Sequence, residues 1–540
     1  MMFQRRLPLP FWLVAIVCVL YAFVGVLTHD PWKTADAVNL STAKSIAFKG
    51  GTTAEALMLP RVAGSTPANK PPLYFWVSAA TARAASAVAG ADAWVAGARS
   101  ASALFVLIGL MAISLASRGF YGEEAGLVAP LIAIGTLGLI VPAHDAQPIT
   151  IAFAAFGLVM AALAWWEVKP IMAGSAIGIS ALIASAGVGM GATWVVASIV
   201  MIAVCFARWR RVAPMAWALA AIISLFGLLL WPALLLKVNA DAFAAWWTWQ
   251  TEPNTRALLD AKRMQVLAWG GWPALPLAAW SVWVNRATLL AGRHVIPVAT
   301  FAAAGALFLY SAEPFEGIVP LVAPLAVLGS AGAGRLRRGA ANAFDWFAGI
   351  TITLILAIVW VAGIAIQTGE PARIAKNFTK PAPGFVADFS LLNWSIAAIV
   401  AVTWVAMIFL LPKSPWRATT RWATGMLCTW LTIGALVLPW ADYSKTYRLV
   451  SADLRLALRN DRGCIAADGV GIGQLAAFDV LDDIRTEPGD RTTRCPWLLR
   501  QAYPGSPTGT PGWQLIVESA RPGDRTEVYR LYRRSAAPSP

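Results

Sequence analysis

Apolar runs long enough to cross a membrane recur along this chain, and no other feature constrains its fold as strongly. Each run has about 17–20 residues, enough for a helix to span roughly 30 Å of hydrocarbon. Of the 540 residues, 58% are hydrophobic and 13% are charged, whereas soluble domains carry about a quarter charged residues. Because a helix satisfies its own backbone hydrogen bonds in lipid, we expect a polytopic α-helical membrane protein.

The runs give thirteen candidate spans, and the basic loops between them predict the orientation. The spans lie near residues 10–28, 100–117, 125–141, 149–166, 171–188, 190–206, 214–236, 264–284, 296–311, 317–333, 345–366, 393–411 and 422–441. Loops after the even-numbered spans are basic, as in ARWRR at 207–211 and GRLRRG at 334–339. The positive-inside rule therefore puts these loops and the N-terminus, with Arg5 and Arg6, in the cytoplasm. The first run lacks a cleavage site and is expected to be an uncleaved anchor.

This placement of charge also explains the net charge of +15. The excess of basic residues follows the membrane topology, so we expect no nucleic-acid partner. The predicted partners include membrane lipids.

On the outer side, the topology places a long first loop, residues 29–99, and the whole tail from residue 442. We divide the chain into a membrane domain, residues 1–441, and an outer domain, residues 442–540. In the first loop, Thr34–Lys49 and Pro71–Val88 are predicted to be helices that lie at the membrane interface.

The tail has the pattern of a small α/β domain. GIGQLAAFDVLDDI has helical periodicity, and GWQLIVESA and TEVYRLYRR flank ARPGDR as the two strands of a hairpin. Cys464 and Cys495 are the only cysteines of the tail. On the outer side disulfides persist, so we predict that these two cysteines form one.

Carboxylates and histidines stand together at the outer ends of two spans. His29-Asp30 follows the first span, His144-Asp145 follows the third, and Asp36 lies in the first loop. Carboxylates at a membrane edge are candidates for function, although they also cap helices. The sequence requires no cofactor and we assign no metal ligand. The two His-Asp pairs could hold a divalent ion, but such pairs are more often structural.

Basic side chains are concentrated in the same first loop. They are Lys33, Arg61, Lys70, Arg83 and Arg99. They either bind lipid phosphates or stabilise the charge on a departing phosphate while a carboxylate deprotonates an incoming hydroxyl.

The first loop resembles a known family. HDPWKTADA at 29–37, LMLPRVAGSTPANKPPLYFWV at 57–77 and GARSASALF at 97–105 are similar to the lipid-dependent glycosyltransferases of the GT-C class. The similarity is greatest to the branch of the protein mannosyltransferases and the aminoarabinose transferase that modifies lipid A. It implies a bacterial inner-membrane enzyme that transfers a sugar, with inversion, from a polyprenyl-phosphate donor to a lipid or protein acceptor on the periplasmic face.

The resemblance also implies roles for individual residues. Asp36, or Asp30, is expected to be the base, Asp145 the second acidic group, and Lys70 the contact to the donor phosphate. The remaining residues assigned to substrate binding are Lys33, Arg61, Arg99, Tyr74, His29 and His144.

This chain departs from the family pattern in three places, one of which is GVGMG at 187–191, where many members carry Lys-Gly, and these departures leave other functions open. It has Ala35-Asp36 where the family reads Asp-Glu, and Asn69 where an acidic or aromatic residue precedes Lys-Pro-Pro. The alternatives are a catalytically inactive homologue or a lipid carrier that binds polyprenyl phosphate.

Overall fold

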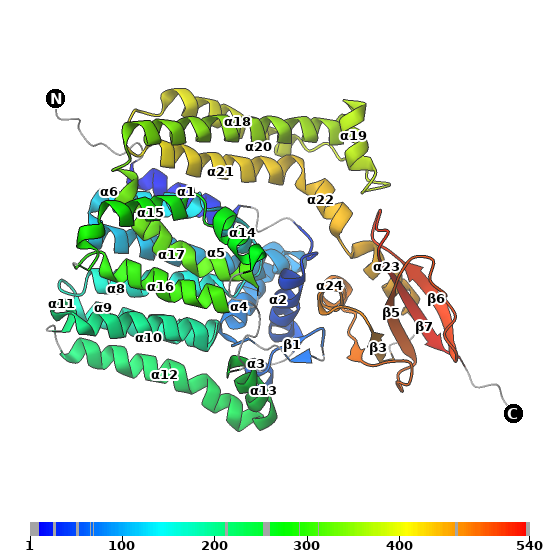
Figure 1. Ribbon diagram of the computed structural model, residues 1–540. Helices are drawn as coiled ribbons and strands as arrows, with labels where there is room; N and C mark the ends of the chain where they lie inside the picture. Colours follow the sequence, from blue (N-terminus) through cyan, green and yellow to red (C-terminus); the bar gives the residue numbers. More distant parts are fainter. Residues whose placement is uncertain are drawn as a thin grey trace.

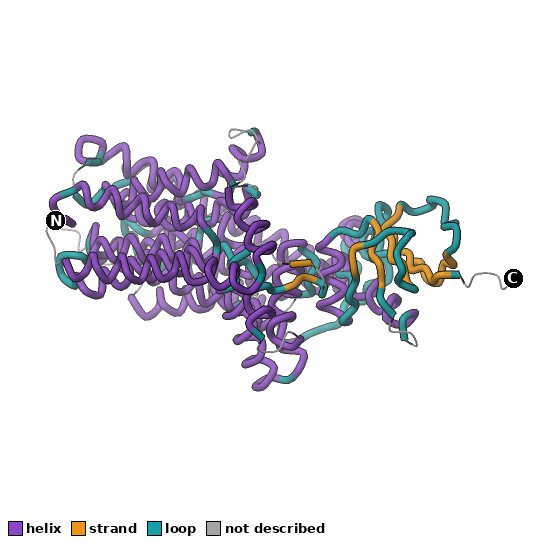
Figure 2. Tube along the Cα trace, turned by 90° about the horizontal axis from the view of Figure 1, so that it is seen from below, coloured by secondary structure: helices purple, strands orange, loops and turns teal. Residues whose placement is uncertain are grey.

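Helices that lie side by side make up most of the molecule, and a small sheet stands at one end of them (Figures 1 and 2). The computed structural model describes residues 10–535 except 25–28, 50–52, 65, 68–69, 211–213, 252–259, 291, 312 and 460–462. The bundle helices are α1 (Phe11–Phe23), α5 (Trp94–Tyr121), α6 (Glu123–Ile134), α7 (Leu137–His144), α8 (Thr150–Ala164), α9 (Pro170–Gly187), α10 (Met190–Cys205), α12 (Pro214–Val238), α14 (Ala261–Gly270), α15 (Ala274–Val284), α16 (Val295–Tyr310), α17 (Pro314–Ala333), α18 (Arg338–Thr368), α20 (Leu391–Leu410) and α21 (Arg417–Leu436).

Each of the thirteen predicted spans coincides with one helix or with a pair of helices. In the described part of the chain, six helices are long and apolar enough to cross a membrane, and bent pairs raise this number to eight. The pairs are α6 with α7, bent by 73°, and α21 with α22 (Leu438–Lys445), bent by 62°. Shorter apolar helices occupy the other predicted segments, so the count of thirteen crossings stays a prediction. The chain is a polytopic helical membrane protein, as expected.

Small residues allow the bundle helices to approach closely. Gly174 of α9 lies against α12, where an added Cβ would come within 2.2 Å of the carbonyl oxygen of Ala216. Gly109 of α5 lies against the ring of Phe153 in α8 in the same way. In a membrane, where lipid is as apolar as the helices, such close van der Waals packing is a main source of helix association.

The first loop crosses the end of the bundle. It contains α2 (Thr34–Lys44), a turn of π-helix (Ser45–Lys49), α3 (Ala54–Met58), the short strands β1 (Arg61–Val62) and β2 (Thr66–Pro67), and α4 (Leu73–Ala89). The two predicted helices of this loop are therefore confirmed as helices. Figure 1 shows α2 across the ends of the bundle helices, between them and the C-terminal sheet, and its expected position at the membrane interface stays a prediction.

The C-terminal domain has the predicted α/β composition. After α23 (Arg448–Ala457) come β3 (Ile465–Asp468), α24 (Ile472–Asp482), β4 (Glu487–Pro488), β5 (Trp497–Ala502), β6 (Trp513–Ser519) and β7 (Val528–Arg534). The strand order is β4-β3-β5-β7-β6, with β3 parallel to β4 and β5 and the other pairs antiparallel. The predicted hairpin is β6–β7, and the Cys464–Cys495 disulfide is present. The proposed boundary after residue 441 falls inside α22, so the division into two domains stays a prediction.

The C-terminal domain packs directly on α2 through α24. Ser41 Oγ donates to a carboxylate oxygen of Asp479 over 2.6 Å, and Lys44 Nζ lies 2.7 Å from Asp483 Oδ1. Gly473 lies against Thr34, where an added Cβ would come within 2.9 Å of the side chain. The sheet domain therefore fixes the helix that carries the residues of the first loop.

The disulfide gives the first prediction. Replacing Cys495 by Ser opens a loop of 31 residues, and the chain-entropy relation predicts that unfolding of the C-terminal domain becomes easier by about 3–4 kcal/mol. The measurement is urea-dependent proteolysis of the tail in the detergent-solubilised protein. Cys205→Ser, which changes a free cysteine of α10, is the control, and equal urea midpoints for the two variants would contradict the prediction.

Candidate functional site

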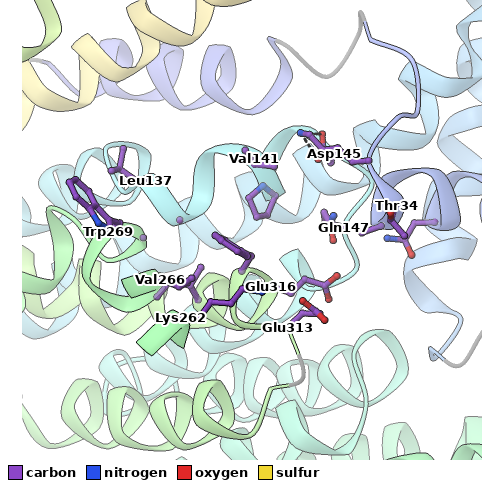
Figure 3. A pocket seen from close by; sticks show the side chains of 18 of the residues that line it. Thr34, Leu137, Val141, Asp145, Gln147, Lys262, Val266, Trp269, Glu313 and Glu316 are labelled. Atoms are coloured by element: carbon purple, nitrogen blue, oxygen red, sulfur yellow. Dashed lines mark hydrogen bonds and ion pairs between the residues drawn. The ribbon is translucent and has the colours of Figure 1, made fainter. Parts of the chain in front are cut away.

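A cavity of about 1110 Å³ opens where α2, α7, α14 and the start of α17 meet. Figure 3 shows Asp145, Gln147 and Thr34 at one end of it and Leu137 and Trp269 at the other. The charged lining residues are Lys33, Lys70, Lys262, Asp145, Glu313 and Glu316. The cavity therefore joins a charged mouth beside α2 to an apolar groove that runs along α7 and α14.

Asp145 is the most buried carboxylate of this cavity. It follows α7 directly, and its side chain is 2% exposed. Lys33 Nζ lies 2.9 and 3.2 Å from its two oxygens, and His29 Nε2 lies 3.4 Å from Oδ1. Burial raises the pKa of the Asp145 carboxyl, but the hydrogen bond from His29 and the charge of Lys33 outweigh burial and hold that pKa below its usual value. Asp145 is therefore ionised at neutral pH.

Lys70 and Lys262 are the other two lysines that line the cavity. Lys70 Nζ lies 3.6 Å from Glu316 Oε2, and both side chains are about one third exposed. Lys262 has its Nζ 5.8 Å from the ring centroid of Phe315, with no ion-pair partner among the described residues. An anion that entered the cavity would thus find lysines held only by weak, partly exposed contacts.

Asp36 lies behind the cavity and is not among its lining residues, and its expected role as the base stays a prediction. Its carboxylate is fully buried and binds the Arg99 guanidinium in a bidentate pair, with contacts of 3.1 Å to Nε and 2.5 Å to Nη2. It also accepts a 2.8 Å hydrogen bond from the backbone N–H of Ala146. Arg99, expected to bind substrate, is equally buried and donates to the His29 carbonyl over 2.7 Å. Asp36 and Arg99 therefore fix the backbone of Ala146 and His29 on the buried side of the cavity.

Asp30, the other candidate base, faces the C-terminal domain. Arg448 binds it with Nε at 2.9 Å and with a second, shorter contact from Nη2. Thr446 Oγ1 donates to it over 2.7 Å, and the Asp30 backbone N–H donates to Asp442. This carboxylate joins the end of the first span to the start of the outer domain and does not line the cavity.

Three residues expected to bind substrate lie elsewhere. Arg61 is on the surface, 3.7 Å from Glu55. Tyr74 is fully buried in α4, with its hydroxyl 2.7 Å from Ser102 Oγ. His144 is buried with its two ring nitrogens near the carbonyl oxygens of Ile140 and Tyr21. Each of these side chains thus has a protein partner away from the cavity lining, and its expected role in substrate binding stays a prediction.

Sequence reasoning missed Lys262, Glu313 and Glu316. The predicted topology already places residues 312–316 on the outer side, because they separate the ninth span from the tenth. The sequence EPFEG puts two glutamates there. Lys262 ends the predicted outer loop before the eighth span. A search for charged residues on every outer loop would have found all three.

The described residues of this cavity provide few free groups that could bind a metal ion. His29 and Asp145 face each other, but Lys33 is bound to the same carboxylate. Within the described ranges, the one group of three potential ligands is Cys464, Glu487 and Cys495, and its two cysteines are joined in the disulfide. The expectation that the His-Asp pairs are structural and hold no metal stays a prediction.

Comparison with known proteins identifies the fold. The crystal structure of ArnT from Cupriavidus metallidurans in the apo state is similar with a TM-score of 0.65 and 15% sequence identity, over 96% of this chain and 97% of that chain. The structure of the same protein bound to undecaprenyl phosphate has a TM-score of 0.64, with the same identity and coverage. No family model and no curated protein sequence matches the chain. The GT-C fold expected from the first loop is therefore confirmed through its likeness to ArnT.

The buried pair behind the cavity gives the second prediction. Arg99→Ala leaves the Asp36 carboxylate buried without its counter-charge, which is expected to lower the free energy of unfolding by about 3–5 kcal/mol. The measurement is a denaturant titration of the detergent-solubilised protein. The control is Arg118→Ala, which breaks an exposed pair with Glu123 and should change stability by less than about 1 kcal/mol. Similar losses in the two variants would show that the buried pair does not support the fold.

The lowered pKa of Asp145 gives the third prediction. A carboxyl whose pKa is lower in the folded protein stabilises it fully above the ordinary value of 3.8, and this stabilisation is lost as pH falls through the lowered pKa. We therefore expect wild type to be more stable than Asp145→Asn by about 1–3 kcal/mol at neutral pH. The difference should shrink only in acid below about pH 4. Thermal unfolding of both proteins across this range tests it, and a difference independent of pH would refute it.

Proposed function

We propose that this chain is a glycosyltransferase of the bacterial inner membrane that transfers a sugar from a polyprenyl-phosphate donor to a lipid or protein acceptor on the periplasmic side. The fold shared with ArnT supports the reaction class. The observation that carries the proposal is the cavity, where Lys33, Lys70 and Lys262 and the buried Asp145 stand at the mouth of an apolar groove. This combination fits a ligand with a charged head and a long hydrocarbon chain.

The donor would lie with its chain in the groove and its phosphate among the lysines. Leu137, Val141 and Ile318 line the apolar part, and the volume of about 1110 Å³ slightly exceeds the range of about 300–1,000 Å³ that is common for small-molecule sites. When the bond from the sugar to the phosphate oxygen breaks, negative charge develops on that oxygen. Lys70 and Lys262 would stabilise it, as preorganised cations do for a leaving group. The ArnT structure with undecaprenyl phosphate shows that the same fold accommodates such a carrier.

Asp145 would accept the hydrogen bond, and then the proton, of the acceptor hydroxyl. In the unliganded protein Lys33 and His29 hold it ionised. A donor phosphate competes with the carboxylate for Lys33, and loss of that charge raises the pKa of Asp145 toward its ordinary range. Binding of the donor would thus make Asp145 a stronger base at the moment when the acceptor needs one. The donor phosphate would also compete with Glu316 for its ion-pair partner Lys70.

Asp36 and Arg99 act in this proposal as positioning residues. The Asp36 carboxylate holds the backbone N–H of Ala146, the residue after Asp145. Arg99 holds the carbonyl of His29, which contacts Asp145 from the other side. The pair would therefore set the position of the base without touching substrate.

The C-terminal domain supports the periplasmic location. Its disulfide, Cys464–Cys495, is of a kind that persists in the periplasm and is rare in the cytosol. The domain packs on α2, and α2 also forms a wall of the cavity. The cavity and the disulfide are thus at the same end of the bundle, on the side that the basic loops predict to be outside.

The fourth prediction tests the reaction. The purified protein in liposomes, given a panel of polyprenyl-phosphate sugars, is expected to release the sugar of one donor. Asp145→Asn should lower turnover by about 100-fold or more, because it removes the base. Lys70→Ala should lower it by about 100-fold, because it removes a cation from the leaving phosphate.

The matched control is Lys376→Ala, an exposed lysine of α19 (Ala372–Thr379) outside the cavity, which should leave turnover unchanged. Turnover that survives Asp145→Asn would contradict the assignment of the base. If no donor is turned over while polyprenyl phosphate binds and Lys70→Ala abolishes binding, the chain is the inactive homologue.

A further inference from the structure

A second cavity, of about 1080 Å³, lies between α18, α20 and α21. It is formed by the start of α18, the end of α20 and the start of α21. In Figure 1 these helix ends lie on the side of the bundle away from the C-terminal sheet. The cavity is thus remote from Asp145, which lies beside α2 at the sheet end, and the two cavities share no lining residue.

The polar end of this second cavity carries an excess of positive charge. Lys413, Arg417 and Arg421 line it together with a single described carboxylate, Asp345. Arg421 Nη1 lies 2.7 Å from Asp345 Oδ1, and Arg417 Nε lies 3.5 Å from Oδ2. Lys413 has no ion-pair partner among the described residues. One carboxylate faces three cations, so two positive charges are not balanced.

The two arginines also have hydrogen-bonding capacity that the protein does not use. The side chain of Arg421 is only 6% exposed, and its Nη2 donates to the Ile408 carbonyl over 3.0 Å. The Nε–H groups of Arg421 and Arg417 are buried and make no hydrogen bond with the described residues, although Arg417 Nε keeps its long 3.5 Å ion-pair contact with Asp345. Unpaired donors and unbalanced charge at a membrane edge are unfavourable. An anion in the cavity would relieve both.

The remaining walls of the cavity are apolar and open to the side. Ile350, Leu354 and Phe409 line it, and their side chains are exposed, at 61%, 59% and 78%. In a membrane helix these exposed surfaces face hydrocarbon. The ligand that fits this shape has an anionic head for the basic cluster and long chains for the apolar walls.

We propose that this groove binds one anionic phospholipid, with its phosphate against Lys413 and Arg417 and its acyl chains along Ile350, Leu354 and Phe409. Guanidinium groups bind phosphate through paired, charge-assisted hydrogen bonds. Basic pockets between membrane helices on the cytoplasmic side are suited to anionic lipid heads, and the positive-inside rule predicts that Lys413 is on that side. The site does not depend on the proposed transferase reaction, because it involves other residues at the other end of the bundle.

Lipid titration by native mass spectrometry tests the proposal, with the full-length protein stripped of lipid in detergent. Phosphatidylglycerol and phosphatidylcholine with identical acyl chains are the two probes. The expected result is tighter binding of the first phosphatidylglycerol than of phosphatidylcholine. Lys413→Ala and Arg417→Gln should each weaken it by about fivefold, as for the loss of one basic residue beside an anionic head. Asp345 keeps its Arg421 partner in both variants, so neither leaves a buried charge unpaired.

Two further variants keep the test independent of folding and of non-specific charge effects. Gly349→Leu retains every charge but places a side chain in the groove that Gly349 lines, and it should also weaken phosphatidylglycerol. Lys376→Ala removes an exposed lysine elsewhere and should change nothing. Equal binding of the two lipids, or unchanged binding in Lys413→Ala and Arg417→Gln, would overturn the proposal. Displacement of phosphatidylglycerol by inorganic phosphate alone would show a free-anion site and would also overturn it.

Discussion

The buried pair of Asp36 and Arg99 is the interaction on which the geometry of the site depends. It joins α2 to α5, and through the backbone N–H of Ala146 it also holds the segment after α7. Asn39 adds a 2.7 Å hydrogen bond to the carbonyl of Ala146. A buried ion pair of this kind is weak evidence for net stability, because desolvation offsets most of the attraction. Its effect is on position, since the low-dielectric surroundings strongly favour the one arrangement in which both charges are satisfied.

The C-terminal domain completes this arrangement from the other side. Asp30 is tied to Arg448 and Thr446 at the start of that domain, while α24 holds α2 through Asp479. The first loop is therefore fixed by the membrane helices beneath it and by the sheet domain above it. Lys33 and Asp145 can then meet at the mouth of the cavity although they are 112 residues apart in the sequence. Such preorganisation is what a site for electrostatic stabilisation requires.

Local patterns in the sequence were enough to predict the helices, the hairpin and the disulfide. The helices and the hairpin are encoded by residues that are near one another in the sequence. The disulfide could be predicted because Cys464 and Cys495 are the only cysteines of the tail. The roles of the acidic residues could not be predicted in the same way. Asp30, Asp36 and Asp145 all stand near a predicted membrane edge, and only their partners distinguish them. Those partners are Arg448, Arg99 and Lys33, and all three pairings join parts of the chain that are at least 63 residues apart.

The dependence on partners that are distant in sequence also explains why Glu316 was not among the predicted site residues. It is one of two acidic residues in a short segment between spans, and its significance comes from Lys70, which lies far away in sequence. The most specific motif of the resemblance to the GT-C class lies in the first loop, so most of the substrate-binding residues assigned from it lie in that loop. The cavity, by contrast, is assembled from four helices, and half of its charged lining comes from outside the first loop and the residues that follow α7.

The central claim is that a polyprenyl phosphate binds in the cavity beside Asp145. The most direct test is a cryo-electron microscopy structure of the protein in a nanodisc with undecaprenyl phosphate. We expect phosphate density within hydrogen-bond distance of Lys70, with Lys33 displaced from Asp145 and the hydrocarbon chain following α7 and α14. A phosphate bound only at Lys413 and Arg417, with Lys33 still paired to Asp145 and no density near Lys70, would contradict it.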